Sequence, residues 1–400
     1  MFNRFHNYVV AQLASINEGG RFTKPDRSDT KAYERYDNDL FQTGRLVTCG
    51  LYINIILKDY VRTILNINRT DSAWSLDPRA DIKSGIFGQA PAQGTGNQVS
   101  AEFNLVYRWH SCISQRDQKW TEDMYRELFP GKEPHEVSLQ GFVSGLAQWQ
   151  MELPQDPQGR PFANLNRKAD GSFDDGDLVK IFAESVEDVA GAFGVSQVPT
   201  VLKSVEVLGI QLARSWNMAT LNEFRQYFNL APYKTFEEIN PDPYIAEQLM
   251  RFYDHPDNVE LYPGLIVEDT KPPMVPGSGL CTNYTISRAI LSDAVALVRG
   301  DRFYTVDFTP KSLTNWAYNE ISYDTSVDQG HVFYKLVLRA FPNHFNGNSI
   351  YAHFPLVIPS ENRKILSHLR LAEKYDWDEP KYTPIPQFIN SHAACMAILA

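Results

Sequence analysis

Cysteine is scarce in this 400-residue sequence. Its four cysteines, Cys49, Cys112, Cys281 and Cys395, lie far apart and form no Cys-x-x-Cys pair. Such scattered cysteines exclude a disulfide scaffold and a zinc knuckle, so we expect free thiols in a reducing compartment. Long apolar runs are scarce as well: the most apolar stretch, residues 51–57, is far shorter than the roughly 20 residues that span a bilayer. These absences favour a cytoplasmic protein and leave contact with a membrane or lipid-droplet surface open.

Positive charge is also in deficit. The sequence has 38 lysines and arginines against 48 aspartates and glutamates, a formal net charge of −10. A nucleic-acid partner is therefore excluded, because the chain lacks the basic excess that neutralises phosphates. Apolar residues make up 43% and charged residues 22% of the chain, a composition that excludes a disordered or fibrous protein.

Apolar residues recur mostly at three-to-four spacing, and strand-like alternation is nearly absent, so the sequence predicts a mainly α fold. Thr220-Leu-Asn-Glu matches a helix capping box, and Gly194 follows a periodic segment as a C-cap would. Residues 71–98 are typical of a long loop, and prolines in the last fifty residues predict extended pieces. The expected helices cover residues 2–16, 39–65, 99–114, 122–129, 138–151, 177–193, 198–212, 220–228, 241–253, 285–298 and 330–340.

One local cluster carries chemistry, the segment EFNLVYRWHS at residues 102–111. Tyr107 and His110 are three residues apart, so on one helix they share a face about one turn apart. If His110 ligates a haem iron, Tyr107 lies close to the porphyrin edge, where an oxidised haem can take an electron and a proton from a phenol. The resulting tyrosyl radical can remove a hydrogen atom from an unactivated C–H bond. Spacing alone leaves the alternative open that the pair serves core packing and a hydrogen bond.

The same segment resembles the proximal segment of the cyclooxygenase and animal haem peroxidase superfamily, in which a Tyr-x-Trp-His string holds the catalytic tyrosine and the axial histidine. Later landmarks follow in the same order: LNEFR at 221–225, LAPYKTFEE at 230–238, VELYPGL at 259–265 and GDRFY at 300–304. Within the superfamily, TDSAWSLDPR, YRWHSCISQRDQKW and IYAHFPLVIPSEN are similar to the fungal fatty-acid (linoleate) dioxygenases, which include linoleate diol synthases and psi-producing oxygenases.

The resemblance implies a cyclooxygenase-like helical domain and roles for particular residues. Tyr107 matches the hydrogen-abstracting tyrosine, and His110 matches the proximal axial ligand of the iron of haem b. The implied activity is a haem-dependent dioxygenase that forms a hydroperoxide from an unsaturated C18 fatty acid, linoleic or oleic acid, and molecular oxygen, in oxylipin biosynthesis. We expect a hydrogen-bond acceptor on the second ring nitrogen of His110 to orient the imidazole, and the sequence does not identify this acceptor. A homo-oligomer is compatible with these observations.

Residues around the motif receive weaker assignments. Packing or contact with a haem propionate is equally compatible with Arg108 and Trp109. The acyl channel could use the apolar neighbours of the motif, although core packing is favoured for each: these are Leu105, Val106 and Ile113. Structural salt bridges are favoured for Arg214 and Arg225, so we expect both outside the site.

The resemblance also implies features that this sequence lacks. In relatives, a distal histidine and a calcium-binding loop precede the catalytic tyrosine by well over a hundred residues, whereas His6 matches a later helix. DGSFDDGD at residues 170–177 lacks the glutamate of an EF-hand loop and predicts an acidic turn rather than a calcium site.

The boundaries of the resemblance predict two parts. We expect residues 1–355 to form a dioxygenase domain incomplete at its N-terminus, and residues 356–400 to form a linker and the start of a truncated cytochrome P450-like domain. Cys395 lacks the glycine-rich loop of a haem-thiolate ligand. The alternative function is a truncated, catalytically impaired member without the distal histidine or the P450 isomerase domain.

Overall fold

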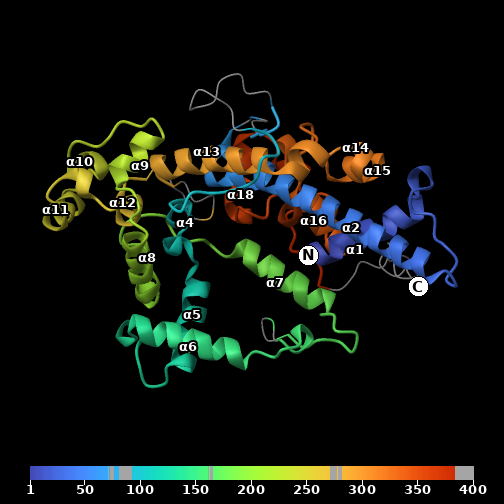
Figure 1. Cartoon of the computed structure of the whole chain (residues 1–400), viewed down its shortest axis with the longest axis horizontal. Helices are drawn as coiled ribbons and strands as arrows, with labels where there is room; N and C mark the ends of the chain where they lie inside the picture. The colour runs from blue at the N-terminus through green and yellow to red at the C-terminus, as the bar shows by residue number, and fades with distance from the viewer. Residues whose placement is uncertain are drawn as a thin grey trace.

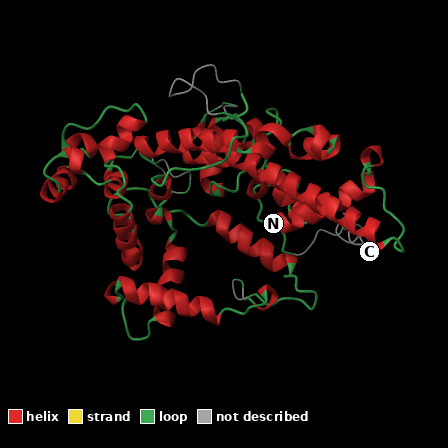
Figure 2. Cartoon of the chain, viewed as in Figure 1, coloured by secondary structure: helices red, strands yellow, loops and turns green. Residues whose placement is uncertain are grey.

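The computed structural model describes residues 1–382 with the exception of 71, 73–75, 81–91, 161, 163–164, 271–276 and 278–281. Helices joined by loops make up the described part (Figure 2), and its only β-structure consists of isolated bridges such as Thr220 with Glu260. The predicted mainly α fold is therefore confirmed. Cys281, Cys395, most of residues 71–91 and the final residues 383–400 lie outside the described residues.

Eighteen α-helices occur in the described residues, connected by short 3₁₀ turns and interrupted by two π-helical turns, Ile56–Tyr60 and Phe303–Asp307. The α-helices are α1 (Phe2–Ile16), α2 (Thr30–Ile55), α3 (Val61–Ile64), α4 (Phe103–Val106), α5 (Gln115–Leu128), α6 (Leu139–Glu152), α7 (Asp175–Glu187), α8 (Lys203–Ser215), α9 (Leu221–Tyr227), α10 (Phe236–Ile239), α11 (Pro243–Phe252), α12 (Leu261–Val267), α13 (Tyr284–Gly300), α14 (Pro310–Leu313), α15 (Asn315–Ile321), α16 (Phe333–Ala340), α17 (Ile350–His353) and α18 (Pro359–His368).

Several predicted helices are confirmed closely. The periodic segment 2–16 is α1 with the same bounds, and the capping box is present: Thr220 accepts from the backbone N–H of Glu223, whose carboxylate accepts from the backbone N–H of Thr220. Other predictions are wrong. The segment predicted over 177–193 ends at Glu187, so Gly194 does not cap it. The C-terminal stretch includes a ten-residue helix, α18, because Pro359 occupies its first turn, where no N–H is needed.

Residues 30–64 form a continuous helix that runs from α2 through a π-helical turn into α3. By length and composition alone this helix could cross a membrane, which the short apolar stretch at residues 51–57 did not predict. Half of its most apolar window is buried in the structure. The buried side packs along α1 (Figure 1) through Leu40, Val47 and Leu51, which join Phe5 and Val9 in one core cluster.

The π-helical turn brings a buried carboxylate, Asp59, to the start of a distant helix. Asp59 is 2% exposed and accepts hydrogen bonds from the backbone N–H groups of Val332 (3.0 Å) and Phe333 (3.3 Å). His331 Nδ1 lies 3.0 Å from the same carboxylate. No side chain of its own caps the N-terminus of α16, so Asp59 satisfies the unpaired N–H groups that every helix start leaves.

The described core comprises three large clusters and a small one. The first lies among α4, α8–α13, the second joins α1 and α2 to α14–α16, and the third joins α7 to α16–α18. The small cluster lies between α5 and α6; in Figure 1, α6 lies at the lower edge of the molecule and α5 runs down to it. Leu366 of α18 packs in the third cluster with Val337 and Ile350. The division of the chain at residue 355 stays a prediction.

Candidate functional site

The segment that contains Tyr107 and His110 is not one continuous helix, so the predicted helix over residues 99–114 is wrong. α4 ends at Val106, and a 3₁₀ turn over His110–Cys112 follows. The indole Nε1 of Trp109 donates to the carbonyl of Val106 at 2.8 Å. In an α-helix that carbonyl accepts the N–H four residues later, that of His110. The indole N–H of Trp109 replaces the N–H of His110 as the donor to this carbonyl, and the chain turns between Val106 and His110.

Aromatic rings surround Tyr107. Its ring stacks on Trp109 with centroids 5.3 Å apart and lies 4.7 Å from the ring of Phe103. Burial, and then the charge of Asp293, raise the pKa of Tyr107 to about 12, although the residue is 38% exposed. The phenol therefore keeps its proton at neutral pH. Burial, and then the neighbouring phenol of Tyr107, raise the pKa of Tyr60 above its usual range.

His110 is held through one ring nitrogen only. Its Nδ1 contacts Oε1 of Glu206, and the hydroxyl of Tyr262 lies 3.4 Å from the same nitrogen. Tyr262 donates to both oxygens of Glu206, at 2.8 and 2.9 Å. With Nδ1–H donated to the carboxylate, Nε2 carries the lone pair, and it contacts no hydrogen-bonding group of the described residues.

A haem iron fits this arrangement. A metal-ligating imidazole presents one nitrogen to the metal and donates the other N–H to a carboxylate or a similar acceptor. The side chain of His110 is 26% exposed, and Nε2 is its ring nitrogen that lacks a hydrogen-bond partner among the described residues. Glu206 is therefore the acceptor that the sequence did not identify. It lies 96 residues further along the chain, and no spacing rule connects the two positions.

Two glycines allow the surrounding elements to approach closely. The N–H of Gly191 donates to the carbonyl of Cys112 at 3.1 Å, and a Cβ at Gly191 would lie 2.3 Å from the carbonyl oxygen of Ser111. On α8, a Cβ at Gly209 would lie 2.9 Å from the ring of Tyr262. Gly191 thus lies against the turn that contains His110, and Gly209 lies against Tyr262.

The remaining residues of the motif serve the scaffold. Leu105 and Val106 are 1% and 0% exposed in the first core cluster, which agrees with core packing rather than a channel wall. The guanidinium of Arg108 lies 5.7 Å from the ring centre of Tyr262 and donates to Asn104 at 2.8 Å.

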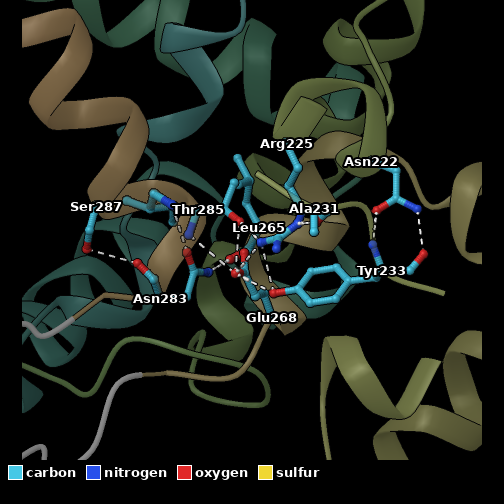
Figure 3. A network of polar contacts seen from close by, with 10 residues as sticks. Asn222, Arg225, Ala231, Tyr233, Leu265, Glu268, Asn283, Thr285 and Ser287 are labelled. Atoms are coloured by element: carbon cyan, nitrogen blue, oxygen red, sulfur yellow. Dashed lines mark hydrogen bonds and ion pairs between the residues drawn. The ribbon is translucent and has the colours of Figure 1, made fainter. Parts of the chain in front are cut away.

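The landmark segments meet in a buried polar network (Figure 3). Arg225 pairs with Glu268 at 3.2 Å and donates to Thr285 at 2.6 Å, and the hydroxyl of Tyr233 donates to Glu268 at 2.8 Å. Arg214 forms an exposed pair with Glu260 through two hydrogen bonds of 2.6 and 2.9 Å. Neither arginine contacts the residues that hold His110, so the predicted structural salt bridges are confirmed. Together the two pairs fix α8, α9 and α12 relative to one another.

Other candidate groups have local roles. His6 Nε2 lies 3.1 Å from the carbonyl of Phe41, and Asp174 caps α7 through the N–H of Gly176. Cys49 and Cys112 are free thiols. Within the described ranges, no group of three or more His, Cys, Asp or Glu could hold a metal ion.

Tyr60, the neighbour of Tyr107, contributes to the wall of a cavity of about 240 Å³. Most of its lining is apolar and includes Ile64, Val186, Ala190 and Leu356. Ala190 directly precedes Gly191, whose N–H holds the turn of His110. The cavity therefore offers an apolar space next to the aromatic surroundings of Tyr107.

Comparison with known proteins agrees with the geometry. The model of the animal haem peroxidase family matches residues 1–329. The whole chain is 78% identical to psi-producing oxygenase A of Aspergillus fumigatus, 72% identical to psi-producing oxygenase A of Emericella nidulans and 59% identical to 7,8-linoleate diol synthase of Pyricularia oryzae. It spans only 37%, 37% and 34% of the lengths of these relatives.

Solved structures agree in fold. Fatty acid alpha-dioxygenase of Oryza sativa superposes with a TM-score of 0.53 at 17% identity, over 85% of this chain and 54% of that one. The Arabidopsis thaliana enzyme gives a TM-score of 0.52 at 16% identity, over 97% and 55%. The predicted fold class is thereby confirmed. The chain belongs to the animal haem peroxidase family, and over its whole length it is similar to the fungal psi-producing oxygenases and linoleate diol synthases.

Proposed function

We propose that this chain is the haem-binding part of a dioxygenase that forms a hydroperoxide from linoleic or oleic acid, in oxylipin biosynthesis. The observation that carries the proposal is the arrangement of His110. Its Nδ1 is engaged by Glu206, its Nε2 has no hydrogen-bond partner among the described residues, and its side chain is partly exposed next to the aromatic cluster of Tyr107. The family and the linoleate in the names of several relatives support the same activity.

His110 and Tyr107 have different roles in the proposed reaction. His110 would hold haem b, which supplies the one-electron oxidation of a nearby phenol. Tyr107 keeps its proton at rest, since its pKa of about 12 lies far above neutral pH, and its stack on Trp109 fixes the ring. As a phenoxyl radical, Tyr107 removes a hydrogen atom from an acyl C–H bond and reforms its O–H bond. Dioxygen adds to the carbon, and the peroxyl group takes a hydrogen atom back from Tyr107 to give the hydroperoxide.

Positioning of the acyl chain decides which carbon reacts, because a small displacement of reacting atoms costs rate steeply. The cavity beside Tyr60 is apolar enough to take part of such a chain. From this apolar cavity and from the linoleate in the names of relatives, we infer that the substrate is an unsaturated C18 fatty acid. A cytoplasmic location and contact with a lipid surface stay predictions.

The second candidate function is a catalytically impaired member that binds haem weakly or not at all. The chain spans 37% and 34% of the lengths of two of these relatives, so the activity of this chain alone is a separate question from the activity of the relatives. Haem binding by this chain separates the two candidates.

Titration of the 400-residue chain with haemin tests the proposal first. We expect a Soret band that is lost in His110→Ala, because the axial ligand is removed. We expect the band to be kept in His6→Ala, because His6 contacts Phe41 and a neighbouring asparagine rather than the residues around His110. Absence of a band in the unaltered chain would contradict haem binding and favour the impaired member.

Incubation with linoleate tests the chemistry next. We expect hydroperoxide from the haem-loaded chain and none from Tyr107→Phe, which keeps the ring and loses the phenolic O–H. The Soret band of Tyr107→Phe serves as the control for haem binding. Unchanged product in this variant would overturn the radical assignment.

A further inference from the structure

We propose that Glu206 is a positioning residue that sets the basicity of His110, and through it the affinity and the reduction potential of the bound haem. The inference rests on the proposed function, since it requires haem on His110. It goes beyond that function by assigning the electronic control of the site to one carboxylate.

The first step is the geometry of a three-residue chain of hydrogen bonds. Glu206 of α8 receives Nδ1–H of His110 from the 3₁₀ turn and the hydroxyl of Tyr262 from α12. The two donors lie 96 and 56 residues away in sequence, so three separate elements meet at this carboxylate. Tyr262 reaches both carboxylate oxygens and thereby fixes the orientation of the group toward His110.

The second step is charge. His110 is the only ion-pair partner of Glu206 among the described residues, so no lysine or arginine there neutralises the carboxylate. Glu206 is 20% exposed and Tyr262 only 1%, which limits the screening of this charge by water. Arg108 acts on the ring of Tyr262 from 5.7 Å rather than on Glu206 directly.

The third step separates this role from simple support of the backbone. The 3₁₀ turn of His110 is already tied to Gly191 by the hydrogen bond to Cys112 and to Val106 by the indole of Trp109. Glu206 therefore contributes little to fixing the backbone conformation of this turn. Its effect falls on the imidazole, where a carboxylate acceptor on one nitrogen raises the electron donation of the other nitrogen to a metal.

The experiment compares haem-reconstituted variants of the 400-residue chain. Glu206→Gln keeps an acceptor for Nδ1–H and removes the negative charge, so the midpoint potential of the iron rises because the ferric state loses a donor. Glu206→Ala removes the acceptor altogether, and the dissociation constant for haemin rises about 10- to 100-fold. Haemin titration and spectroelectrochemistry measure both quantities.

Two further variants make the test specific. Tyr262→Phe leaves Glu206 with one donor fewer, so the carboxylate binds Nδ1–H more strongly and the potential falls, a shift opposite in sign to that of Glu206→Gln. Glu260→Gln removes a carboxylate near the start of α12 that pairs with Arg214 and Tyr253, and we expect no shift.

The outcomes distinguish this inference from the proposed function. Haem binding by the unaltered chain with the same potential in Glu206→Gln overturns the role of Glu206 alone. The same conclusion follows if Tyr262→Phe and Glu206→Gln shift the potential in one direction. A chain that forms no Soret band overturns both.

Discussion

Asp293 on α13 is an ionisable side chain that the proposed chemistry does not use. One of its carboxylate oxygens is buried without a hydrogen-bond partner among the described residues. Burial, and then the negative charge of Glu102, raise the pKa of Asp293 to about 6. The charged groups that face it are Glu102 and, when ionised, Tyr107. Asp293 thus carries an electrostatic cost in the folded state.

Replacing Asp293 by asparagine removes this cost in a pH-dependent way. The folded-state pKa of about 6 lies above the ordinary value of 3.8, so the folded chain binds more protons between these values. Stability then falls as pH rises through this window. We expect Asp293→Asn to raise the free energy of unfolding by about 1–2 kcal/mol at pH 7.5 and by much less at pH 4.5. Urea unfolding at both pH values checks this, and an equal gain at both would contradict it.

The sequence located the site only in part, for a physical reason. Tyr107 and His110 lie in one short segment, so a local motif suffices to propose them. Glu206 and Tyr262 complete the surroundings of His110 through contacts across 96 and 152 residues. No helical period connects such positions. The ELYP landmark contains Tyr262, yet its role depends on α8 and α12 packing together.

At the scale of elements, the break after α4 decides how the site is built. Periodicity predicted a helix through residues 99–114 because apolar residues recur across the segment. The competing interaction, an indole that takes the carbonyl of Val106, has no signature in apolar spacing. The resulting turn is then fixed by the close approach of Gly191 to two carbonyl oxygens, those of Ser111 and Ile113.

Gly191→Ala tests this dependence. Its Cβ would lie 2.3 and 2.8 Å from those backbone oxygens, which cannot rotate away as a side chain can. We expect a loss of about 1–3 kcal/mol in the free energy of unfolding together with weaker haem retention. Gly347→Ala is the matched control, because no atom lies within 4 Å of its added Cβ. Equal stability of the two variants would show that the turn tolerates displacement.

At the scale of the whole molecule, packing is uneven. The first and second clusters each join five or more helices, whereas the cluster between α5 and α6 has four buried members, Tyr125, Val137, Phe142 and Val201. Helical periodicity predicted α6 closely and only the second half of α5, which begins at Gln115 rather than at residue 122. It did not predict that they would extend away from the larger clusters (Figure 1), because amphipathic spacing identifies a buried face and not its partner.

Hydrogen exchange measures this difference. We expect the amides of α5 and α6 to exchange before those of residues 40–55 in α2, since few buried contacts must be broken to open the arm. Phe142→Ala weakens the small cluster, so it should speed exchange in α5 and α6 and leave α2 unchanged. Mass spectrometry of peptides from both regions reads this out. A uniform change across the chain would contradict an independently opening arm.

The contact of Asp59 with the start of α16 has a consequence for the order of folding. α16 has eight residues, too few to be stable alone, because helix nucleation is unfavourable. Its capping carboxylate comes from a residue 273 positions earlier. α16 therefore gains its cap only after residues 59 and 332 have met and the entropy of closing the loop between them has been overcome. We therefore expect α16 to form late in folding, together with the tertiary contacts around it rather than as an isolated helix.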